Sequence, residues 1–372
     1  MEMPVRAVAA AREALHDPAG VAARWRSGHQ GPVIAHLPYD VPVELIHAAG
    51  ALPVGVFPSG TGGEHAQAHL QGWICSPARR FLTAARQGEL EWADGLIIPQ
   101  ICDTMRGLKG LWQFLQRPSF LEAYYLPRTG RESALPYLTG ELTRLRDRLG
   151  EFSGRTVEAG DLFRSITLYN AVRTRLDLLF QRHVNRPAQI TNLTWYTLVR
   201  ASFILPPEEM LPLLDEVLAV QPEGPAGGVP LVVSGQLMEP LSLAGLLDAS
   251  GVVVVGDDLV DGQRACQAVP EESDPLAALA RRAWNSLPCA AIIGPVGRET
   301  YLADLVRERR AVGVIFLHFR NCEMENLGYP GLRDHLERRG IPTLYLETQW
   351  GTAAAGSVAT RLEAFREMLE GF

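Results

Sequence analysis

Residues 93–112, ADGLIIPQICDTMRGLKGLW, combine a short apolar strand with a polar turn. The predicted strand, Gly95–Pro99, is followed directly by Cys102. The same order returns near the C-terminus, where the predicted strand Val312–Phe319 is followed by Cys322. A strand that runs through a turn into a helix is typical of α/β folds, in which the strands are mostly parallel.

Further strands and helices alternate on both sides of these two segments. Additional strands are predicted at Val33–His36, Leu52–Phe57, Ala123–Leu126, Leu231–Ser234, Val252–Val255, Ala290–Ile293 and Thr343–Leu346. Helices are predicted at Val43–Ala49, Pro77–Gln87, Pro275–Ser286 and Arg298–Arg309. The run of four valines at 252–255 is continuous rather than alternating, as expected for a strand covered on both faces. We therefore predict an α/β fold with two Rossmann-like, doubly wound lobes on parallel sheets and a helical segment between them.

The chain has 372 residues, which is long for a single core and indicates two domains. From Pro136 to about Val220 the apolar pattern is helical. The stretch Gln221–Pro230, QPEGPAGGVP, is rich in proline and glycine and is the best candidate boundary. The predicted organisation is a helical extension (1–30), a first α/β lobe (31–135), a helical segment (136–220) and a second α/β lobe (221–372).

Composition and charge exclude several classes of protein. With 47% hydrophobic and 21% charged residues, the balance is that of a soluble globular protein. The net charge of −7 offers no basic surface for nucleic acid or an anionic membrane. Met1–Gly20 lacks the apolar core of a secretory signal, so we expect a cytoplasmic protein whose thiols stay reduced. Lys109, the only lysine, is followed by Gly110, so the chain lacks a P-loop and should not hydrolyse ATP through one.

Five cysteines are present and none forms a Cys-x-x-Cys pair, which excludes zinc-ribbon and thioredoxin sites. Free cysteines are often small buried hydrophobic residues, and this interpretation is kept for Cys266 and Cys289. Cys102 and Cys322 instead follow predicted strands, whose carboxyl ends line the ligand crevice of open α/β sheets. Cys75, in WICSPARR, precedes a helix whose N-terminal dipole favours a thiolate. Their placement leaves open that all three converge between the lobes and ligate an iron–sulfur cluster.

Four segments together resemble the signature segments of the benzoyl-CoA reductase and 2-hydroxyacyl-CoA dehydratase (D-component) family. They are PYDVPVELIHAAGALPVGV (38–56), WICSPARR (73–80), the quoted 93–112 stretch and GVIFLHFRNCEMENLGYPGLRDHLERRGIPTLYLE (313–347). The similarity runs from about Val33 to Thr360–Phe365, and 93–112 is most similar to the smaller catalytic subunit of benzoyl-CoA reductase. Two positions depart from the family pattern: Glu323 follows Cys322 where aspartate is frequent, and Val260 stands where many relatives carry another cysteine.

The resemblance implies that Cys75, Cys102 and Cys322 hold a [4Fe–4S] cluster between the lobes. It implies an oxidoreductase subunit that passes single low-potential electrons to an aromatic acyl-CoA, with ring reduction to a dienoyl-CoA, as in anaerobic aromatic degradation. ATP would be used by a partner subunit, an ATPase that activates and donates electrons, and not by this chain. The expected partners are that ATPase, a homologous catalytic subunit in a heterodimer, and the acyl-CoA substrate.

Three alternatives stay open. The chain could be a subunit of a 2-hydroxyacyl-CoA dehydratase, which removes water by radical chemistry to give an enoyl-CoA. It could be a non-catalytic electron-relay or scaffold subunit that feeds a sister chain. It could also be an α/β ligand-binding protein without a cluster.

Other polar residues close to these segments are weaker candidates. Ser76 and His318 are considered as a fourth cluster ligand. Glu44 could be an acid/base group near the cluster if its pKa is raised, or a glutamate favoured by a helix N-terminus. Asp103 could cap the next helix, and Arg106 could contact CoA phosphates or pair with Asp103.

The remaining motifs have structural interpretations that we favour. The Gly-rich SGTGGE (Ser59–Glu64) is not GxGxxG and is interpreted as a turn rather than a phosphate loop. His65 and His69 stand four apart without the glutamate of a zinc-binding HExxH helix, which indicates a solvated face. Asp257-Asp258 more often cap a helix than bind a cation or ribose. The tryptophans, including Trp73 and Trp112, are expected to pack the core and shield the cluster.

Overall fold

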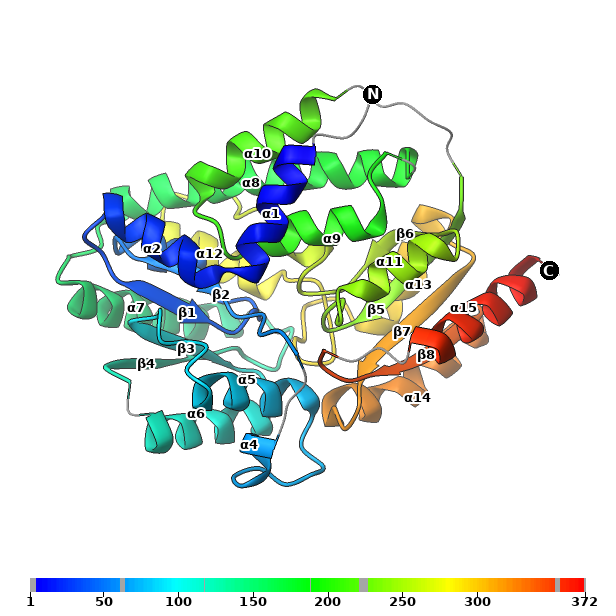
Figure 1. Cartoon of the computed structure of the whole chain (residues 1–372), viewed down its shortest axis with the longest axis horizontal. Coiled ribbons are helices and arrows are strands. Elements are labelled where there is room, and N and C mark those ends of the chain that lie inside the picture. The colour runs from blue at the N-terminus through cyan, green and yellow to red at the C-terminus, as the bar shows by residue number, and fades with distance from the viewer. Residues whose placement is uncertain are drawn as a thin grey trace.

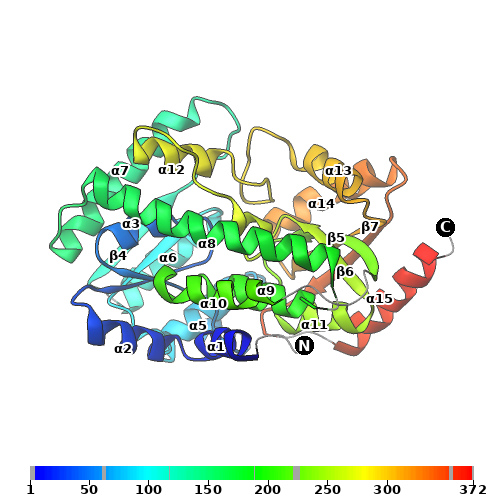
Figure 2. The ribbon, with the colours of Figure 1, turned by 90° about the horizontal axis from the view of Figure 1, so that it is seen from above.

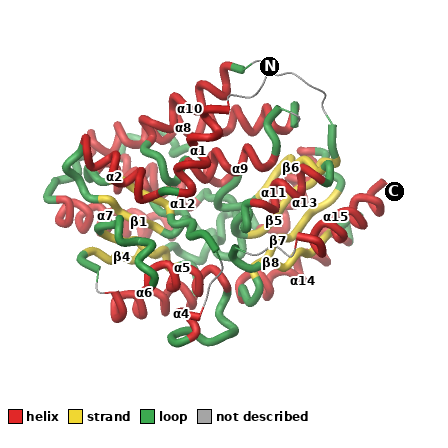
Figure 3. Tube along the Cα trace, viewed as in Figure 1, coloured by secondary structure: helices red, strands yellow, loops and turns green. Residues whose placement is uncertain are grey.

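The computed structural model describes residues 5–60, 64–116, 118–187, 189–220, 227–351 and 355–370. Two lobes, each built on a four-stranded parallel sheet, lie side by side and are covered by helices (Figure 1). The strands form two separate groups, and loops occupy the region where the lobes meet (Figure 3). The predicted α/β fold with two doubly wound lobes is confirmed.

The first lobe is built on a sheet with the strand order β2-β1-β3-β4, in which all neighbours are parallel. Its strands are β1 (Val33–His36), β2 (Leu52–Gly55), β3 (Gly95–Gln100) and β4 (Phe120–Tyr125). Its helices are α3 (Val43–Ala48), α4 (Glu64–Gln67), α5 (Ser76–Arg86), α6 (Asp103–Gln116) and α7 (Ala134–Ser153). Every residue of β1, β2 and β3 is buried, which explains why these strands are continuous apolar runs without alternation.

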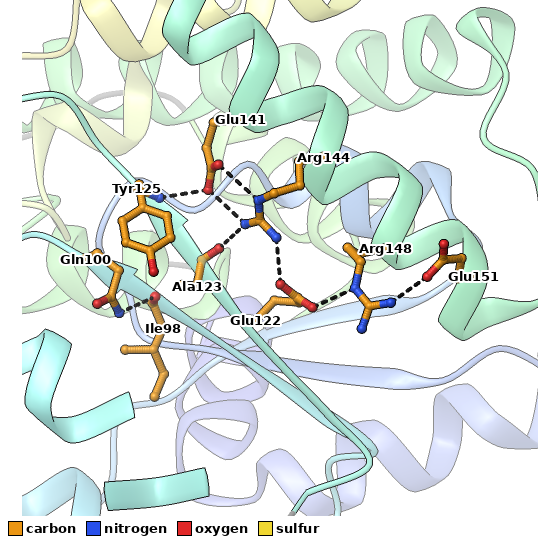
Figure 4. Close-up of polar contacts among 9 residues, drawn as sticks. All are labelled: Ile98, Gln100, Glu122, Ala123, Tyr125, Glu141, Arg144, Arg148 and Glu151. Carbon is orange, nitrogen blue, oxygen red and sulfur yellow. Dashed lines mark hydrogen bonds and ion pairs between the residues drawn. The ribbon is translucent and has the colours of Figure 1, made fainter. Parts of the chain in front are cut away.

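Ion pairs join the edge strand β4 to α7 (Figure 4). Arg144 lies 2.7 Å from the Glu122 carboxylate and 2.8 Å from that of Glu141. Glu141 in turn accepts a hydrogen bond of 3.1 Å from the backbone N–H of Tyr125. Arg148 extends the row by pairing with Glu122 at 2.8 Å. The helix therefore engages polar groups of an edge strand, whose unpaired backbone is a liability for aggregation.

The second lobe repeats this topology with the strand order β6-β5-β7-β8. Its strands are β5 (Val229–Gly235), β6 (Val252–Asp257), β7 (Gly313–Phe319) and β8 (Thr343–Thr348). Its helices are α11 (Ser242–Ala249), the 3-10 helix η1 (Gln263–Cys266), α13 (Arg298–Arg309), α14 (Glu323–Glu337) and α15 (Ala355–Glu370). In both sheets the chain adds a strand on one side of its first strand and then continues on the other side. Such switch points are where α/β folds bind ligands.

The middle of the chain is helical, with α8 (Ala159–Asn185), α9 (Asn192–Ala201) and α10 (Pro207–Ala219). The long α8 crosses both lobes, since it contacts α3 in the first and η1 and β6 in the second (Figures 1 and 2). The N-terminal helices are α1 (Val5–His16) and α2 (Pro18–Gly28), and α1 packs on α9 and α10. Residues 221–226 of the expected linker lie outside the described ranges. Within those ranges no helix is both long and apolar enough to cross a membrane.

The prediction of a strand at Ala290–Ile293 is wrong. The chain from α12 (Pro275–Trp284) to Ile292 leaves the second lobe and packs on the first, where α12 contacts α7. Ala291 and Ile292 are buried in the apolar core of the first lobe, and Ile292 accepts a 3.1 Å bond from the N–H of Cys289 in a turn. The apolar pattern correctly indicates burial of Ala291 and Ile292, but Ile293 is exposed, and the pattern cannot show which surface covers the buried residues.

Candidate functional site

The carboxyl ends of the two sheets face each other. This is seen from the contacts between residues that follow strands of one lobe and residues of the other lobe. Asp40, beyond β1, lies 3.4 Å from Arg264 of the second lobe. The Ser76 hydroxyl accepts a 2.9 Å hydrogen bond from the N–H of Trp350, which follows β8. These contacts close the crevice at the edge where α/β sheets bind ligands.

Three cysteines stand in this crevice, each directly before a helix. Cys75 precedes α5, Cys102 precedes α6 and Cys322 precedes α14. In each case a backbone N–H of the first helical turn is directed at the sulfur; these belong to Ala78, Met105 and Glu325 respectively. Three helix N-termini, each carrying a partial positive charge, are thus aimed at three sulfur atoms.

The cysteines are close enough for their charges to interact. Burial is the main cause that raises the pKa of Cys75, to about 11, and ionisation of Cys102 raises it further. Burial likewise raises the pKa of Cys102 and of Cys322, and ionised Cys75 and Cys102 add to the shift at Cys322. Conversion of these thiols to thiolates would therefore require a compensating positive charge.

Tyr39 is close enough to the three thiols for their charges to act on its hydroxyl. It is fully buried, and its pKa is raised first by burial and then by Cys75, Cys322 and Cys102. Its hydroxyl has no hydrogen-bond partner within the described part of the chain. Buried donors are nearly always bonded, so the unpaired hydroxyl could donate to a group held by these cysteines.

The surrounding loops are also unusual. The side-chain amide of Gln236, directly after β5, donates a 3.0 Å hydrogen bond to the sulfur of Cys322. Asp40 and Asn321, the neighbours of Tyr39 and Cys322, have φ angles of 50° and 62°. Such left-handed backbone is strained for residues other than glycine and persists where the surrounding structure requires it.

A buried network of ion pairs contacts the first turn of α14, directly after Cys322. Arg298 lies 3.0 Å from Glu325 and 2.9 Å from Asp258, and His318 lies 2.9 Å from Glu325. Burial alone would raise the pKa of Glu325, but Arg298 and His318 outweigh it and lower that pKa to about 2. The charged network fixes the first turn of α14, whose N–H is directed at Cys322.

The two candidates for a fourth ligand have other partners. Ser76 bonds to Trp350, as described above, and is 4% exposed. His318 is fully buried on β7, beside Glu325 and the rings of Phe316, Tyr329 and Tyr345.

Glu44 is fully buried and forms an ion pair with Arg173 of α8. Burial alone would raise its pKa, but Arg173 and then Arg282 outweigh burial and hold the pKa below its ordinary value. The raised pKa expected of an acid/base group is therefore not found. Asp103 and Arg106 are exposed and lie 3.3 Å apart, one turn from each other on α6.

The weaker motifs are scattered. Thr61–Gly63 of SGTGGE and the side chain of His65 lie outside the described residues, and His69 is exposed. Trp112 is buried in the first lobe as expected, with 4% of its surface exposed. For Trp73 the expectation is wrong, because it is 67% exposed in the loop before Cys75.

Asp257 and Asp258 are both buried and bonded within the protein. Asp257 accepts hydrogen bonds of 2.9 to 3.0 Å from the N–H groups of Gln263 and Leu259 and from the Tyr196 hydroxyl. Asp258 accepts from Ser234 and pairs with Arg298. These partners favour the structural interpretation of the pair over a ligand site.

The Asp257→Asn variant should flatten the dependence of stability on pH. Burial raises the pKa of Asp257 to about 7, so the folded chain keeps a proton that the unfolded chain releases above about pH 4. The free energy of unfolding should therefore fall as the pH rises from about 4 to 7, and this fall should be smaller in the variant. Urea unfolding across that range measures both slopes. Parallel curves for the two proteins would contradict the assignment.

Tyr39 and Gln236 were missed in the sequence although each follows a predicted strand at the same edge as the cysteines. The buried network of Arg298 was missed as well, since no local motif marks it.

The chain has relatives along most of its length. Residues 38–369 match the family model described as 2-hydroxyglutaryl-CoA dehydratase, D-component. A benzoyl-CoA reductase subunit of Thauera aromatica is 30% identical over 334 residues, which are 86% of each chain. The (R)-phenyllactyl-CoA dehydratase beta subunit of Clostridium sporogenes is 25% identical, covering 90% of this chain and 91% of its own. The beta subunit of (R)-2-hydroxyglutaryl-CoA dehydratase from Acidaminococcus fermentans is 26% identical, covering 90% of this chain and 92% of its own.

These relatives are named as subunits of reductases and dehydratases, and the match extends over both lobes and the helices between them. The resemblance noted in the sequence is thereby confirmed. The chain belongs to the 2-hydroxyglutaryl-CoA dehydratase D-component family, and its relatives include a benzoyl-CoA reductase subunit.

Proposed function

We propose that this chain is an iron–sulfur subunit of an acyl-CoA-reducing complex, in which Cys75, Cys102 and Cys322 hold a [4Fe–4S] cluster. The observation that supports this best is the unpaired, buried Tyr39 hydroxyl, which is close to three thiols that each precede a helix.

The residues present fit such a cluster. Thiolates are the ligands that iron–sulfur clusters prefer, and three helix N-termini offset part of the negative charge. Across the described ranges, no three His, Cys, Asp or Glu side chains converge on a point that suits a single metal ion. Ligands of a cluster bind separate irons and do not need to converge in this way. Three thiolates leave one iron open, as catalytic metal sites do.

When bound, the cluster would supply single low-potential electrons. Gln236 and Tyr39 would donate hydrogen bonds to its sulfur atoms, and such bonds are one determinant of the reduction potential. The network of Arg298 and Glu325 would hold the Cys322 loop in place. Glu44 would act in positioning, since its pair with Arg173 ties α3 to α8 and keeps it ionised.

The favoured reaction is reduction of an aromatic acyl-CoA to a dienoyl-CoA, with the benzoyl-CoA reductase subunit as the relative that supports it. The second candidate is dehydration of a 2-hydroxyacyl-CoA, which the dehydratase relatives support. An electron-relay subunit is the third. In each case we propose a cytoplasmic heteromer with a homologous subunit and an ATPase that donates electrons, since the relatives are named as subunits.

The test is to produce the chain anaerobically, alone and with the products of neighbouring genes, and to quantify iron and sulfide. About four of each per chain are expected. The complex is then given ATP, a low-potential reductant and either benzoyl-CoA or a 2-hydroxyacyl-CoA. Ring reduction supports the favoured reaction, and dehydration alone supports the second candidate. Iron in a subunit that binds neither ester when isolated supports the relay, and no iron after reconstitution with partners contradicts the proposal.

A further inference from the structure

A cavity of about 60 Å³ lies between the two lobes, beside α8. Asp40 of the first lobe lines it together with Arg173 of α8. Arg264 of η1 and Arg282 of α12 complete its charged lining, and the remainder is largely apolar. Three guanidinium groups from three different elements thus border one small space.

One of these three guanidinium groups has no ion pair within the part of the chain that the structure describes. Arg173 is paired with Glu44, and Arg264 lies 3.4 Å from Asp40. Arg282 donates a 2.9 Å bond from its Nε to a backbone carbonyl, and among the described residues no carboxylate lies within ion-pair distance of it. Arg173 and Arg264 thus each have a carboxylate partner, whereas Arg282 donates to a neutral carbonyl. Burial and the neighbouring Arg173 lower the pKa of Arg282, as expected where a cation lacks a partner.

One of the lining residues also has an unused hydrogen-bond donor. Arg264 is 1% exposed, and its Nε has no hydrogen-bond partner in the part of the chain that the structure describes. Its other nitrogens donate to Ser286 and to the carbonyl of Asp258. A buried guanidinium that leaves one donor free needs an acceptor, and the planar donor fork of arginine suits oxyanions best.

The size of the space limits what can bind. A volume of this kind needs to be only about 10–15 Å³ to hold one water, so about 60 Å³ admits several waters or an anion of a few heavy atoms. Asp40 lies next to Tyr39 in sequence, so the cavity borders the cysteine site but uses different side chains.

From the Arg282 cation without an ion pair, the free Arg264 donor and the limited space, we infer that the cavity binds one small oxyanion, a free carboxylate or inorganic oxyanion. The anion bridges the two lobes through Arg264 and Arg282 and leaves the cysteines untouched. This site goes beyond the proposed function and does not depend on a cluster.

The test uses the purified full-length chain and its Arg282→Gln variant, with Arg281→Gln as the matched control. Arg281 is the neighbouring residue of α12, but it pairs with Glu272 and its side chain is 44% exposed. Formate and inorganic phosphate are titrated at constant ionic strength, maintained with chloride, and the melting temperature is followed. A response to formate alone indicates a carboxylate-sized site, and a response to both admits tetrahedral oxyanions.

The wild-type chain and Arg281→Gln should show the same saturable rise in melting temperature. In Arg282→Gln the affinity should fall about tenfold or more, as expected for loss of a charge-assisted hydrogen bond. Without added oxyanion, this variant should melt no lower than the wild type, because the buried cation that it removes has no ion pair. The absence of a saturable response in the wild type, or an equal response in Arg282→Gln, would mean that water alone fills the cavity and would overturn the inference.

Discussion

Replacing Cys322 with serine is expected to reduce the iron content of the anaerobically purified chain from about four per chain to nearly none. Cys322 is the single proposed ligand from the second lobe, whereas Cys75 and Cys102 both belong to the first. A serine hydroxyl is a poor substitute for a thiolate at iron. Iron and sulfide analysis and the visible absorption of the cluster measure the loss.

Two further variants separate ligation from general damage to the fold. Cys266→Ser changes a half-buried cysteine of η1, away from the three helix N-termini, and should keep its iron. Tyr39→Phe removes the unpaired hydroxyl but leaves all three thiols, so it should keep its iron while its reduction potential shifts. Full iron content in Cys322→Ser would show that the three-cysteine assignment is incorrect.

The Arg298→Met variant is expected to lose about 3–5 kcal/mol of the free energy of unfolding. Arg298 is 8% exposed and compensates two fully buried carboxylates, Asp258 and Glu325. Methionine fills similar space but removes the ion pair of Asp258 and leaves Glu325 with His318 alone, so desolvation of both carboxylates is less well compensated. Urea unfolding at neutral pH measures the loss.

A matched control is available at the surface. Arg320 pairs with Glu347 at 3.1 Å, but the two side chains are 56% and 42% exposed. Arg320→Met should therefore lose less than about 1 kcal/mol, since solvent screens exposed pairs. If Arg298→Met is as stable as Arg320→Met, the buried carboxylates are protonated or hydrated in the variant, and the network does not hold the loop as we describe.

The placement of Cys102 and Cys322 at one crevice could be predicted because each follows a strand. Parallel strands bring their carboxyl ends to one edge, so a cysteine after each of two strands indicates a shared crevice. Tyr39 and Gln236 obey the same rule. They were overlooked because tyrosine and glutamine are ordinary loop residues and no spacing marks them as partners of sulfur.

Buried ion pairs could not be predicted in the same way. Glu44 and its partner Arg173 are 129 residues apart, and no local pattern links them. A raised pKa of Glu44 was considered in the sequence because burial raises the pKa of a carboxyl group. The ion pair with Arg173 shifts this pKa in the opposite direction and outweighs burial. The pKa of a buried carboxylate depends on charges that only the fold brings together.

The return of α12 to the first lobe bears on how the chain is made. Protein synthesis starts at the N-terminus, and domains generally fold in the order in which they emerge. Here α7 and the first sheet are complete long before residues 275–292, which cover part of their apolar surface, leave the ribosome. During that interval the nascent chain exposes an apolar surface that promotes aggregation, so its survival in the cell depends on prompt elongation or on chaperones that shield it.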